Sequence, residues 1–548
     1  MIYNIIAIIV CVILPFVLLK KELNIKDKNL KSIIKENKYV IVIYSILMVG
    51  MLVRLVNIEN IPYGFGGDEA SEGYEAYSLL NYGCDRHLKS FPIHFISWGS
   101  GQNALYAYID IPFIAVLGLT EIAVRLPMAL LGCLTLICIY LFFNKYTTRK
   151  ITIIMLTAIA ICPWHIMKSR WALESNIFPD LILLSSMLLY IGVTDRKKVC
   201  WLIGLVIIGL STYSYGTSYF FVPVFLAILL ITLCIKKKIK IWQAIVSYCV
   251  VGIIALPLMV FILINNLNLP EIDLGIITIP RLTANRYQEI SSVFSKDFLT
   301  DSLNNFINSI KMIITENDGM QSNRLERFGL FYKFGIIFIV IGLIDSINNK
   351  KDELSEINWY FTSMFATGIL LMFVCDPNIN RLNIVMIPLI YYIAIGVYRV
   401  TKKIDKSIYI FTLLYFILFG WFALAYFNII ERQPYCFEHD IKEAVQYVST
   451  LNDKEIYVYS DRIDTYIYYL FYSKEDPKVF CDSVEYSTNG ANWERVKKYK
   501  NYNFYIPKEM KNEKNLVYVI PSENKFNINY DEWKTSYYGR FIVLERKD

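Results

Sequence analysis

The sequence predicts a polytopic α-helical membrane protein that carries a small α/β domain in its C-terminal part. Of its 548 residues, 55% are hydrophobic and only 19% are charged, whereas soluble domains carry roughly 25% charged residues. The mean hydropathy is +0.41. The apolar residues also gather in blocks long enough to cross a bilayer as helices. These observations exclude an ordinary soluble enzyme.

Thirteen apolar blocks lie along the first 430 residues, each close to the length that a membrane-spanning helix needs. They cover residues 2–19, 39–56, 104–119, 122–143, 151–167, 177–193, 200–215, 218–235, 241–265, 329–346, 358–375, 382–398 and 407–427. The first block has no basic segment before it and no small-residue cleavage site after it, so we expect a retained span.

Basic connectors predict the orientation of these blocks, because cytoplasmic loops are enriched in Lys and Arg. One block, 104–119, contains Asp110 and Pro112 and is the natural candidate to lie in the interface or dip back. If it does not cross, about twelve spans remain, and every basic connector lies in the cytoplasm. These connectors are 20–38, 145–150, 196–198, 236–240, 350–351 and 399–406.

This topology predicts a multi-pass plasma-membrane protein with two domains. Residues 1–430 form a transmembrane domain with external loops 57–121 and 266–328, accompanied by external juxtamembrane helices. Residues 431–548 form an extracytoplasmic soluble α/β domain, in which 438–451 reads as a helix and 455–460 and 515–520 read as strands.

The motifs that are missing narrow the function. The sequence contains no P-loop, no GxGxxG and no Cys/His spacing typical of zinc. We therefore expect no nucleic-acid partner and no required cofactor, and the question of a divalent cation stays open. A protein that works outside the cytoplasm without a nucleotide site is expected to use an energised substrate carried there by a lipid.

Two adjacent carboxylates, Asp68 and Glu69, follow the second apolar block within the sequence Gly66-Gly67-Asp68-Glu69-Ala70. One interpretation is helix capping: Asp68 suits an N-cap, and acidic residues suit a first helical turn. The other is chemistry, because charge near a bilayer is costly and marks functional sites. An amphipathic stretch, 72–82, follows and is predicted to lie along the membrane surface.

Two further external groups carry charge. Arg170 and Glu174 share a face if their turn is helical, where they form either a neutralised ion pair or part of a polar cavity. Arg381 opens a later span directly after Asn380. Arg381 either extends to the interface or binds a lipid-linked phosphate, which a guanidinium can hold bidentately.

Several of these motifs in order resemble a known family. The sequences Gly67-Asp68-Glu69-Ala70, 118–127, Trp164-His165-Ile166 and Asn380-Arg381-Leu382-Asn383 are similar to external motifs of bacterial membrane glycosyltransferases. The resemblance is to the protein O-mannosyltransferase and aminoarabinose transferase type of the glycosyltransferase C superfamily, over roughly residues 40–400. It implies many transmembrane helices, a polyprenyl-phosphate-linked sugar donor and inversion at the anomeric carbon.

The resemblance also implies roles for individual residues. Asp68 would be the catalytic general base, and Glu69 would position the base or the acceptor. The donor and its phosphate would be bound by Arg170, Glu174, His165, Arg381 and Asn380. No metal ligand is implied by the resemblance or by the residues.

The predicted enzyme therefore transfers a hexose or pentose from a polyprenyl-phosphate donor to a hydroxyl of a cell-envelope polymer, lipid or protein. One alternative is a polysaccharide polymerase or ligase, which also uses lipid-linked substrates but does not require the acidic pair. Another is a lipid or sugar transporter, which would favour inverted repeats and charges at mid-membrane.

Overall fold

The computed structural model consists of two compact units. It describes residues 2–24, 30–284, 291–292, 295–348, 354–404, 407–428, 437–487, 493–523, 526 and 529–547. The first unit comprises Met1–Ile61, Leu126–Ala255 and Gln288–Arg432, and the second comprises Pro62–Arg125, Leu256–Tyr287 and Gln433–Asp548. The predicted domain boundary between residues 430 and 431 lies outside the described ranges and stays a prediction.

Nine helices within the described residues are long and apolar enough to cross a membrane. They are Ile2–Glu22 (α1, Ile2–Leu19, with η1, Lys20–Glu22), α3 (Lys38–Leu55), α6 (Glu121–Tyr146), α9 (Glu174–Thr194), α11 (Ser218–Ile235), α12 (Ile241–Asn266), α16 (Ser355–Val374), α17 (Asn383–Lys403) and Ile410–Phe427 of α18 (Ser407–Phe427). The predicted fold class, a polytopic helical membrane protein, is confirmed.

The remaining predicted spans are shorter helices. They are α7 (Arg149–Ala160), α10 (Lys198–Ser211) and α15 (Gly335–Asn348), and the block expected to stay in the interface is α5 (Leu105–Leu117). The prediction of one continuous span over 151–167 was wrong, because α7 ends at Ala160 and α8 (Pro163–Lys168) starts afresh. Pro163 lacks a backbone N–H, so it suits the first position of a new helix.

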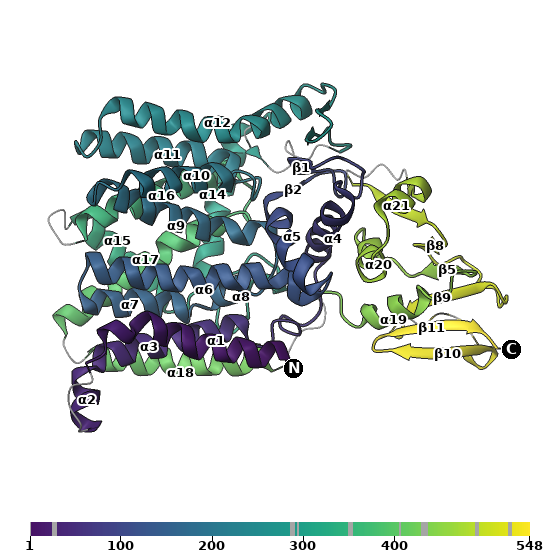
Figure 1. Cartoon of the computed structure of the whole chain (residues 1–548), viewed down its shortest axis with the longest axis horizontal. Helices are drawn as coiled ribbons and strands as arrows, with labels where there is room; N and C mark the ends of the chain where they lie inside the picture. The colour runs from purple at the N-terminus through teal and green to yellow at the C-terminus, as the bar shows by residue number, and fades with distance from the viewer. Residues whose placement is uncertain are drawn as a thin grey trace. The chain divides into compact units, whose positions relative to one another are not determined.

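The core of the first unit is built around α17, of which 89% of the most apolar window is buried. Figure 1 shows α17 among the helices of this unit, with α15 beside it. A Cβ on Gly342 would lie 2.0 Å from the carbonyl oxygen of Tyr392, and one on Gly396 would lie 2.2 Å from that of Phe338. Only glycine permits so close an approach of two helix backbones.

Two further helices and a short turn complete the first unit. They are α2 (Leu30–Glu36), α14 (Phe298–Thr315) and η3 (Gln321–Asn323). The helix α14 packs against α16, where the rings of Phe306 and Phe373 stack with centroids 4.4 Å apart. Part of the predicted external loop 266–328 is therefore helical.

The second unit contains a seven-stranded mixed sheet in the order β10-β11-β9-β5-β8-β7-β6 within the described residues. Its strands are β5 (Glu455–Val458), β6 (Glu485–Ser487), β7 (Arg495–Tyr499), β8 (Tyr502–Asn503), β9 (Leu516–Pro521), β10 (Trp533–Tyr538) and β11 (Phe541–Arg546). The pairs β5–β9 and β5–β8 are parallel, and the other pairs are antiparallel. The predicted strands at 455–460 and 515–520 correspond to β5 and β9.

Helices flank this sheet, and one of them, α20, packs on α4 (Gly67–Tyr82) of the predicted external loop 57–121. They are α19 (Ile441–Val448), α20 (Thr465–Ser473) and α21 (Pro477–Ser483), with η5 (Tyr530–Glu532) before β10. The predicted helix over 438–451 corresponds to α19. The predicted external loop 57–121 contributes α4 (Gly67–Tyr82) and the hairpin of β1 (His94–Phe95) and β2 (Gln102–Asn103). A second hairpin pairs β3 (Ile272–Asp273) with β4 (Thr278–Ile279).

The helix α4 is the element that positions the predicted catalytic pair, and it is enclosed by protein. It packs on α5 and α20, and most of its residues from Glu69 to Leu79 are buried. The predicted amphipathic surface helix over 72–82 was therefore wrong. The stretch has polar residues on several faces because they hydrogen-bond to neighbouring segments of the same unit.

Candidate functional site

The acidic pair sits in the first turn of α4, but Asp68 is not its N-cap. Gly66 has the extended N-cap conformation, with φ −74° and ψ 148°, and Glu69 at the third helical position accepts a hydrogen bond from the Gly66 backbone N–H at 2.9 Å. Glu69 is therefore the capping residue, which leaves the side chain of Asp68 available for another role.

Glu69 is fully buried and pairs with Arg125. The guanidinium donates from Nε to Oε1 at 2.8 Å and from Nη2 to Oε2 at 2.9 Å. Arg125 also donates to the carbonyl oxygens of Pro62 and Gly64, at 3.1 and 2.6 Å. This bidentate pair fixes the loop that leads into α4 and holds the first helical turn in place.

Asp68 has the opposite environment, because its side chain reaches solvent. Protein still surrounds the carboxylate on enough sides that desolvation raises its pKa to about 6, and the negative charges of Asp464 and Glu69 add to this rise. The positive charge of Arg462 and a hydrogen bond with the Trp98 side chain lower the pKa in part. A carboxylate with this pKa is mostly ionised at neutral pH and is basic enough to accept a proton.

The neighbours of Asp68 come from the far end of the chain. Asp464, at the start of α20, approaches so closely that a Cβ on Gly67 would lie 2.0 Å from its Oδ2 atom. The backbones of Phe65 and Glu438 pair in an antiparallel bridge, and Tyr468 Oη donates to the Phe65 carbonyl at 2.9 Å. These contacts tie the loop before Asp68 to the C-terminal segment within one unit.

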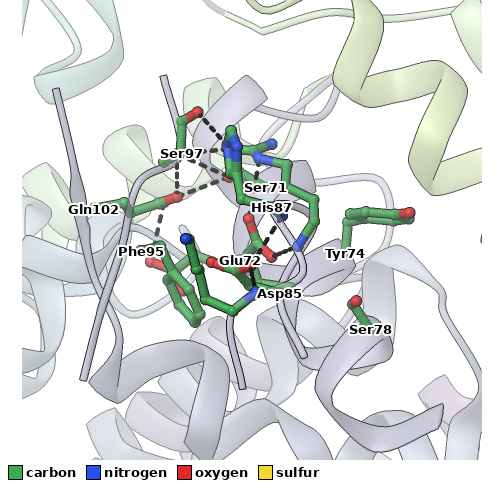
Figure 2. A network of polar contacts seen from close by, with 12 residues as sticks. Ser71, Glu72, Tyr74, Ser78, Asp85, His87, Phe95, Ser97 and Gln102 are labelled. Carbon is green, nitrogen blue, oxygen red and sulfur yellow. Dashed lines mark hydrogen bonds and ion pairs between the residues drawn. The ribbon is translucent and has the colours of Figure 1, made fainter. Parts of the chain in front are cut away.

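A buried polar network supports α4 from the hairpin side. Figure 2 shows Ser71, Ser97 and Gln102 turned toward one another, with Ser71 and Ser97 donating to Gln102 Oε1 at 2.7 and 3.0 Å. Arg86 Nη2 donates to Ser71 Oγ at 3.0 Å and to Ser97 Oγ at 2.5 Å. The Arg86 guanidinium lies 4.7 Å from the ring centroid of Trp98, so the network also holds the indole that bonds to Asp68.

The same network contains carboxyl groups with shifted pKa values. Glu75 forms a fully buried ion pair with Arg86, Oε1 to Nε at 3.0 Å. Burial and the nearby charge of Glu75 raise the pKa of Asp85 to about 8, so Asp85 is largely protonated at neutral pH. Burial and the Arg86 charge lower the pKa of His87 to about 3, so His87 is neutral. These residues form a rigid support whose charge is close to balanced.

The predicted donor-binding residues belong to the first unit, where Arg170 is fully buried. Its guanidinium donates to the backbone carbonyls of Val53, Val56, Asn57 and Ile61 at 2.9–3.2 Å. Some of these carbonyls belong to the last turn of α3, so Arg170 satisfies orphan acceptors at a helix C-terminus. The helical turn that would place Arg170 and Glu174 on one face is not formed, because residues 171–173 are not helical.

His165 lies in a buried cluster that joins α3, α8 and α9. Its Nδ1 atom lies 2.7 Å from Arg54 Nη2, and its Nε2 atom lies 3.1 Å from Asp180 Oδ1. Asp180 Oδ2 also accepts from Lys168 Nζ at 2.5 Å. Arg54 is fully buried as well and donates to the carbonyl oxygens of three residues, Gly50, Ile159 and Ala160.

The other predicted donor-binding residues lie closer to the surface. Arg381 pairs with Asp376 at 2.5 Å, with 20% of the arginine side chain exposed. The Asn380 backbone N–H is held by Asn378 Oδ1 at 2.7 Å. Glu174 is partly exposed at the first position of α9. The catalytic and donor-binding roles assigned to the seven predicted site residues stay predictions.

The sequence did not single out the partners that surround Asp68. Arg462 and Asp464 occur in a polar run that follows a predicted strand, and this is the one local signal that pointed to them. Arg125 stood inside a quoted motif without a role. Within the described ranges, no group of three or more His, Cys, Asp or Glu residues could hold a metal ion.

Comparisons with known proteins identify one matching segment. Residues 104–264 match the family model described as dolichyl-phosphate-mannose-protein mannosyltransferase. No curated protein matches the chain by sequence. The matched segment begins just after the β1–β2 hairpin and includes α5 to α11 entire.

Two of the solved structures with a similar fold are of an oligosaccharyltransferase. An Archaeoglobus fulgidus oligosaccharyltransferase in complex with Zn and sulfate has a TM-score of 0.51 and 12% identity, over 79% of this chain and 61% of its own. The same protein tethered with an acceptor peptide containing the NVT sequon has a TM-score of 0.50 and 12% identity, over 81% and 64%. The chain thus spans less than two thirds of these relatives.

A third similar structure is ArnT from Cupriavidus metallidurans bound to undecaprenyl phosphate. Its TM-score is 0.44 with 10% identity, over 93% of this chain and 98% of its own. At these identities the likenesses to solved structures concern the fold alone.

Proposed function

We propose that this chain is a membrane protein of the glycosyltransferase C superfamily and an inverting transferase that uses a lipid-linked sugar. It would move a hexosyl or pentosyl group from a polyprenyl phosphate to an acceptor hydroxyl on the extracytoplasmic face. The observation that carries the proposal is the environment of Asp68. This carboxylate reaches solvent at the start of a firmly held helix, and its pKa is raised to about 6.

In the proposed reaction, the acceptor oxygen attacks the anomeric carbon as the bond from that carbon to the phosphate oxygen breaks. Asp68 takes the hydroxyl proton, because a free hydroxyl is a weak nucleophile at neutral pH. The products are the glycosylated acceptor, polyprenyl phosphate and a protonated Asp68. Phosphate is a good leaving group, so cationic side chains suffice to stabilise it without a general acid.

The matched family and the similar structures support the type of donor. The family description names a dolichyl-phosphate sugar, and polyprenyl phosphates share the same chemistry. Glu69 would hold the base indirectly, since its bidentate pair with Arg125 fixes the turn that carries Asp68. We propose that no metal is needed, because direct displacement from a phosphate requires one base and positive charge.

The test is sugar transfer by the full chain in lipid nanodiscs, with labelled polyprenyl-phosphate sugars and envelope-derived acceptors. We expect Asp68→Asn to lower kcat by about 10²–10⁴-fold, which is the usual contribution of a general base. The donor should still bind, and folding should be unchanged because the side chain is exposed. Asp482→Asn, at another exposed aspartate of the second unit, is the control.

Full transfer by Asp68→Asn would overturn the assignment of the base. Movement of the lipid-linked sugar across the bilayer without transfer by the wild type would favour the transporter alternative. Labelling of single cysteines at positions 68 and 482 from one side of sealed vesicles tests the predicted extracytoplasmic face. Labelling from the cytoplasmic side alone would contradict that topology.

A further inference from the structure

The loop between β5 and α20 presents an arginine that is held by a carboxylate. Arg462 donates from Nε to Asp464 Oδ1 at 2.8 Å and from Nη2 to Asp464 Oδ2 at 2.7 Å. This bidentate geometry fixes the plane of the guanidinium. The residue Asp464 is 9% exposed, whereas 41% of the Arg462 side chain remains exposed. Two of five N–H donors are therefore occupied, and the side chain is still accessible.

This pair lies beside the proposed base. Asp464 touches the position where a Gly67 side chain would begin, one residue before Asp68. The charges of Asp464 and Arg462 both act on Asp68, in opposite directions. The pair and Asp68 belong to the same compact unit, so this placement depends on contacts within that unit alone.

Two other arginines near α4 in this unit, Arg125 and Arg86, are bonded to buried carboxylates and have structural roles. Arg125 is fully buried on Glu69, and Arg86 is fully buried on Glu75. Neither can meet a substrate without breaking a buried ion pair, which is strongly destabilising. Arg462 differs because it is oriented in advance and remains accessible, so it loses little conformational freedom when it binds a ligand.

We propose that Arg462 binds the phosphate of the lipid-linked donor beside Asp68, held in position for this by Asp464. The inference rests on the proposed function and assigns to the C-terminal segment a substrate contact that the sequence had placed on Arg170 and Arg381. A planar guanidinium matches the oxygens of a phosphate, and its remaining donors can form charge-assisted hydrogen bonds.

The balance of charge favours this ligand at the end of the reaction. With Asp68 ionised, its charge and that of Asp464 both act on the Arg462 guanidinium and weaken its attraction for a phosphate. Once the acceptor proton has neutralised Asp68, one of the negative charges that act on Arg462 is removed, while Asp464 and the more distant Glu438, which is itself paired with Arg540, still act on it. More of the positive charge is then available while the leaving phosphate gains its second negative charge, which is when stabilisation lowers the barrier.

The experiment measures binding of undecaprenyl phosphate, and of uncharged undecaprenol, to the full chain in nanodiscs. We expect Arg462→Gln to weaken undecaprenyl phosphate binding by about 10–100-fold, the equivalent of a lost hydrogen bond to a charged group. Binding of undecaprenol should not change. Arg462→Lys keeps the charge without the fork and should be intermediate. Arg546→Gln, at the exposed end of β11, is the matched control.

Equal undecaprenyl phosphate affinity in folded Arg462→Gln or Arg462→Lys and in the wild type would overturn the inference. A change confined to the KM for the acceptor would also overturn it, because the anion would then belong to the acceptor. Neither result affects the proposed function while the wild type transfers sugar. A wild type that neither binds undecaprenyl phosphate nor transfers sugar would contradict the proposed function itself.

Discussion

Asp68 in the second unit and Asp180 in the first are both aspartates with basic neighbours, yet their surroundings differ in one respect. Asp180 is fully buried, and both of its oxygens are paired, with His165 and Lys168. Asp68 reaches solvent beside a second carboxylate, Asp464, and the nearby Arg462 is already bonded to that second carboxylate. The negative charge of Asp180 is therefore matched by bonded basic side chains, whereas that of Asp68 is not.

This difference separates structure from chemistry. A buried carboxylate whose charge is matched holds helices together, and accepting a proton would break its ion pairs. A carboxylate left without its own cation has a raised pKa and can take a proton during a reaction. Proximity to arginine therefore does not identify a site; what matters is whether the arginine is already bonded to another group.

The largest expected effect on stability comes from replacing Asp180, whose charge is matched by Lys168 and His165. Asp180→Asn leaves Lys168 buried without its counter-ion, and we expect a loss of about 3–5 kcal/mol in the free energy of unfolding, or no folded protein. Chemical unfolding in detergent measures this. Asp376→Asn, whose 62% exposed side chain pairs with Arg381, should cost under about 1 kcal/mol. Equal losses in the two variants would remove the basis of the comparison.

The next effect concerns the direct neighbour of Asp68. Glu69→Gln removes the negative charge opposite the buried Arg125, so we expect a loss of about 2–3 kcal/mol from weakened charge-assisted hydrogen bonds. Thermal unfolding in detergent, with Glu513→Gln at an exposed pair as the control, gives the measurement. A variant as stable as the wild type but inactive would mean that Glu69 acts in the chemistry and not in the fold.

A smaller effect should follow from adding one methyl group at the site. In Gly67→Ala the new Cβ would clash with Asp464 Oδ2, so Asp464 and the bonded Arg462 must move. We expect a cost of about 1–3 kcal/mol together with weaker transfer. The control is Gly216→Ala, where an added Cβ meets no atom within 4 Å. Unchanged stability and unchanged activity at position 67 would contradict the close packing described above.

The smallest effect is a shift in pH dependence. Because the base must be ionised, kcat/KM should fall as the pH drops through about 6. Arg462 lowers the pKa of Asp68, so Arg462→Gln should move this fall in kcat/KM to higher pH. Asp464 raises the pKa of Asp68, so Asp464→Asn should move the fall to lower pH. A pH–rate series with Arg546→Gln as the control measures both shifts. If the fall in kcat/KM moved in the same direction in both variants, the assignment of Asp68 as the base would be refuted.

The ionisation of Asp68 should also make the stability of the folded protein depend on pH. The folded-state pKa of Asp68, about 6, lies above its ordinary value of 3.8. Ionising Asp68 in the folded protein is therefore unfavourable, and its contribution to stability declines as the pH rises from about 4 to above 6. Asp68→Asn should accordingly melt at the same temperature as the wild type, or higher, at pH 8.

The sequence predicted the helices well because membrane spans are encoded locally. Each apolar block became a helix, and the one break inside a predicted span fell at Cys162-Pro163, where a proline starts a new helix. The strands at β5 and β9 followed from runs of β-branched and aromatic residues. Patterns of this kind depend on neighbours in the chain, so one sequence is enough to show them.

The surroundings of Asp68 could not be predicted in the same way. Nothing in the local sequence indicates that Arg462 and Asp464 meet the start of α4, or that Arg54 turns inward to His165 and not toward the interface. These contacts depend on tertiary packing between segments far apart in the chain. The acidic pair itself was found from the sequence, but the division of its two members between support and solvent was not.

The bond from Tyr468 to the Phe65 carbonyl joins residues 403 positions apart. A ribosome that adds about 5–20 residues per second needs roughly 20–80 s to cover that distance. During that interval the predicted external loop 57–121 has left the ribosome, while the C-terminal residues that hold it are not yet synthesised. Nascent chains would therefore gain their completed site only near the end of translation, and a premature stop codon before residue 462 would give an inactive membrane protein.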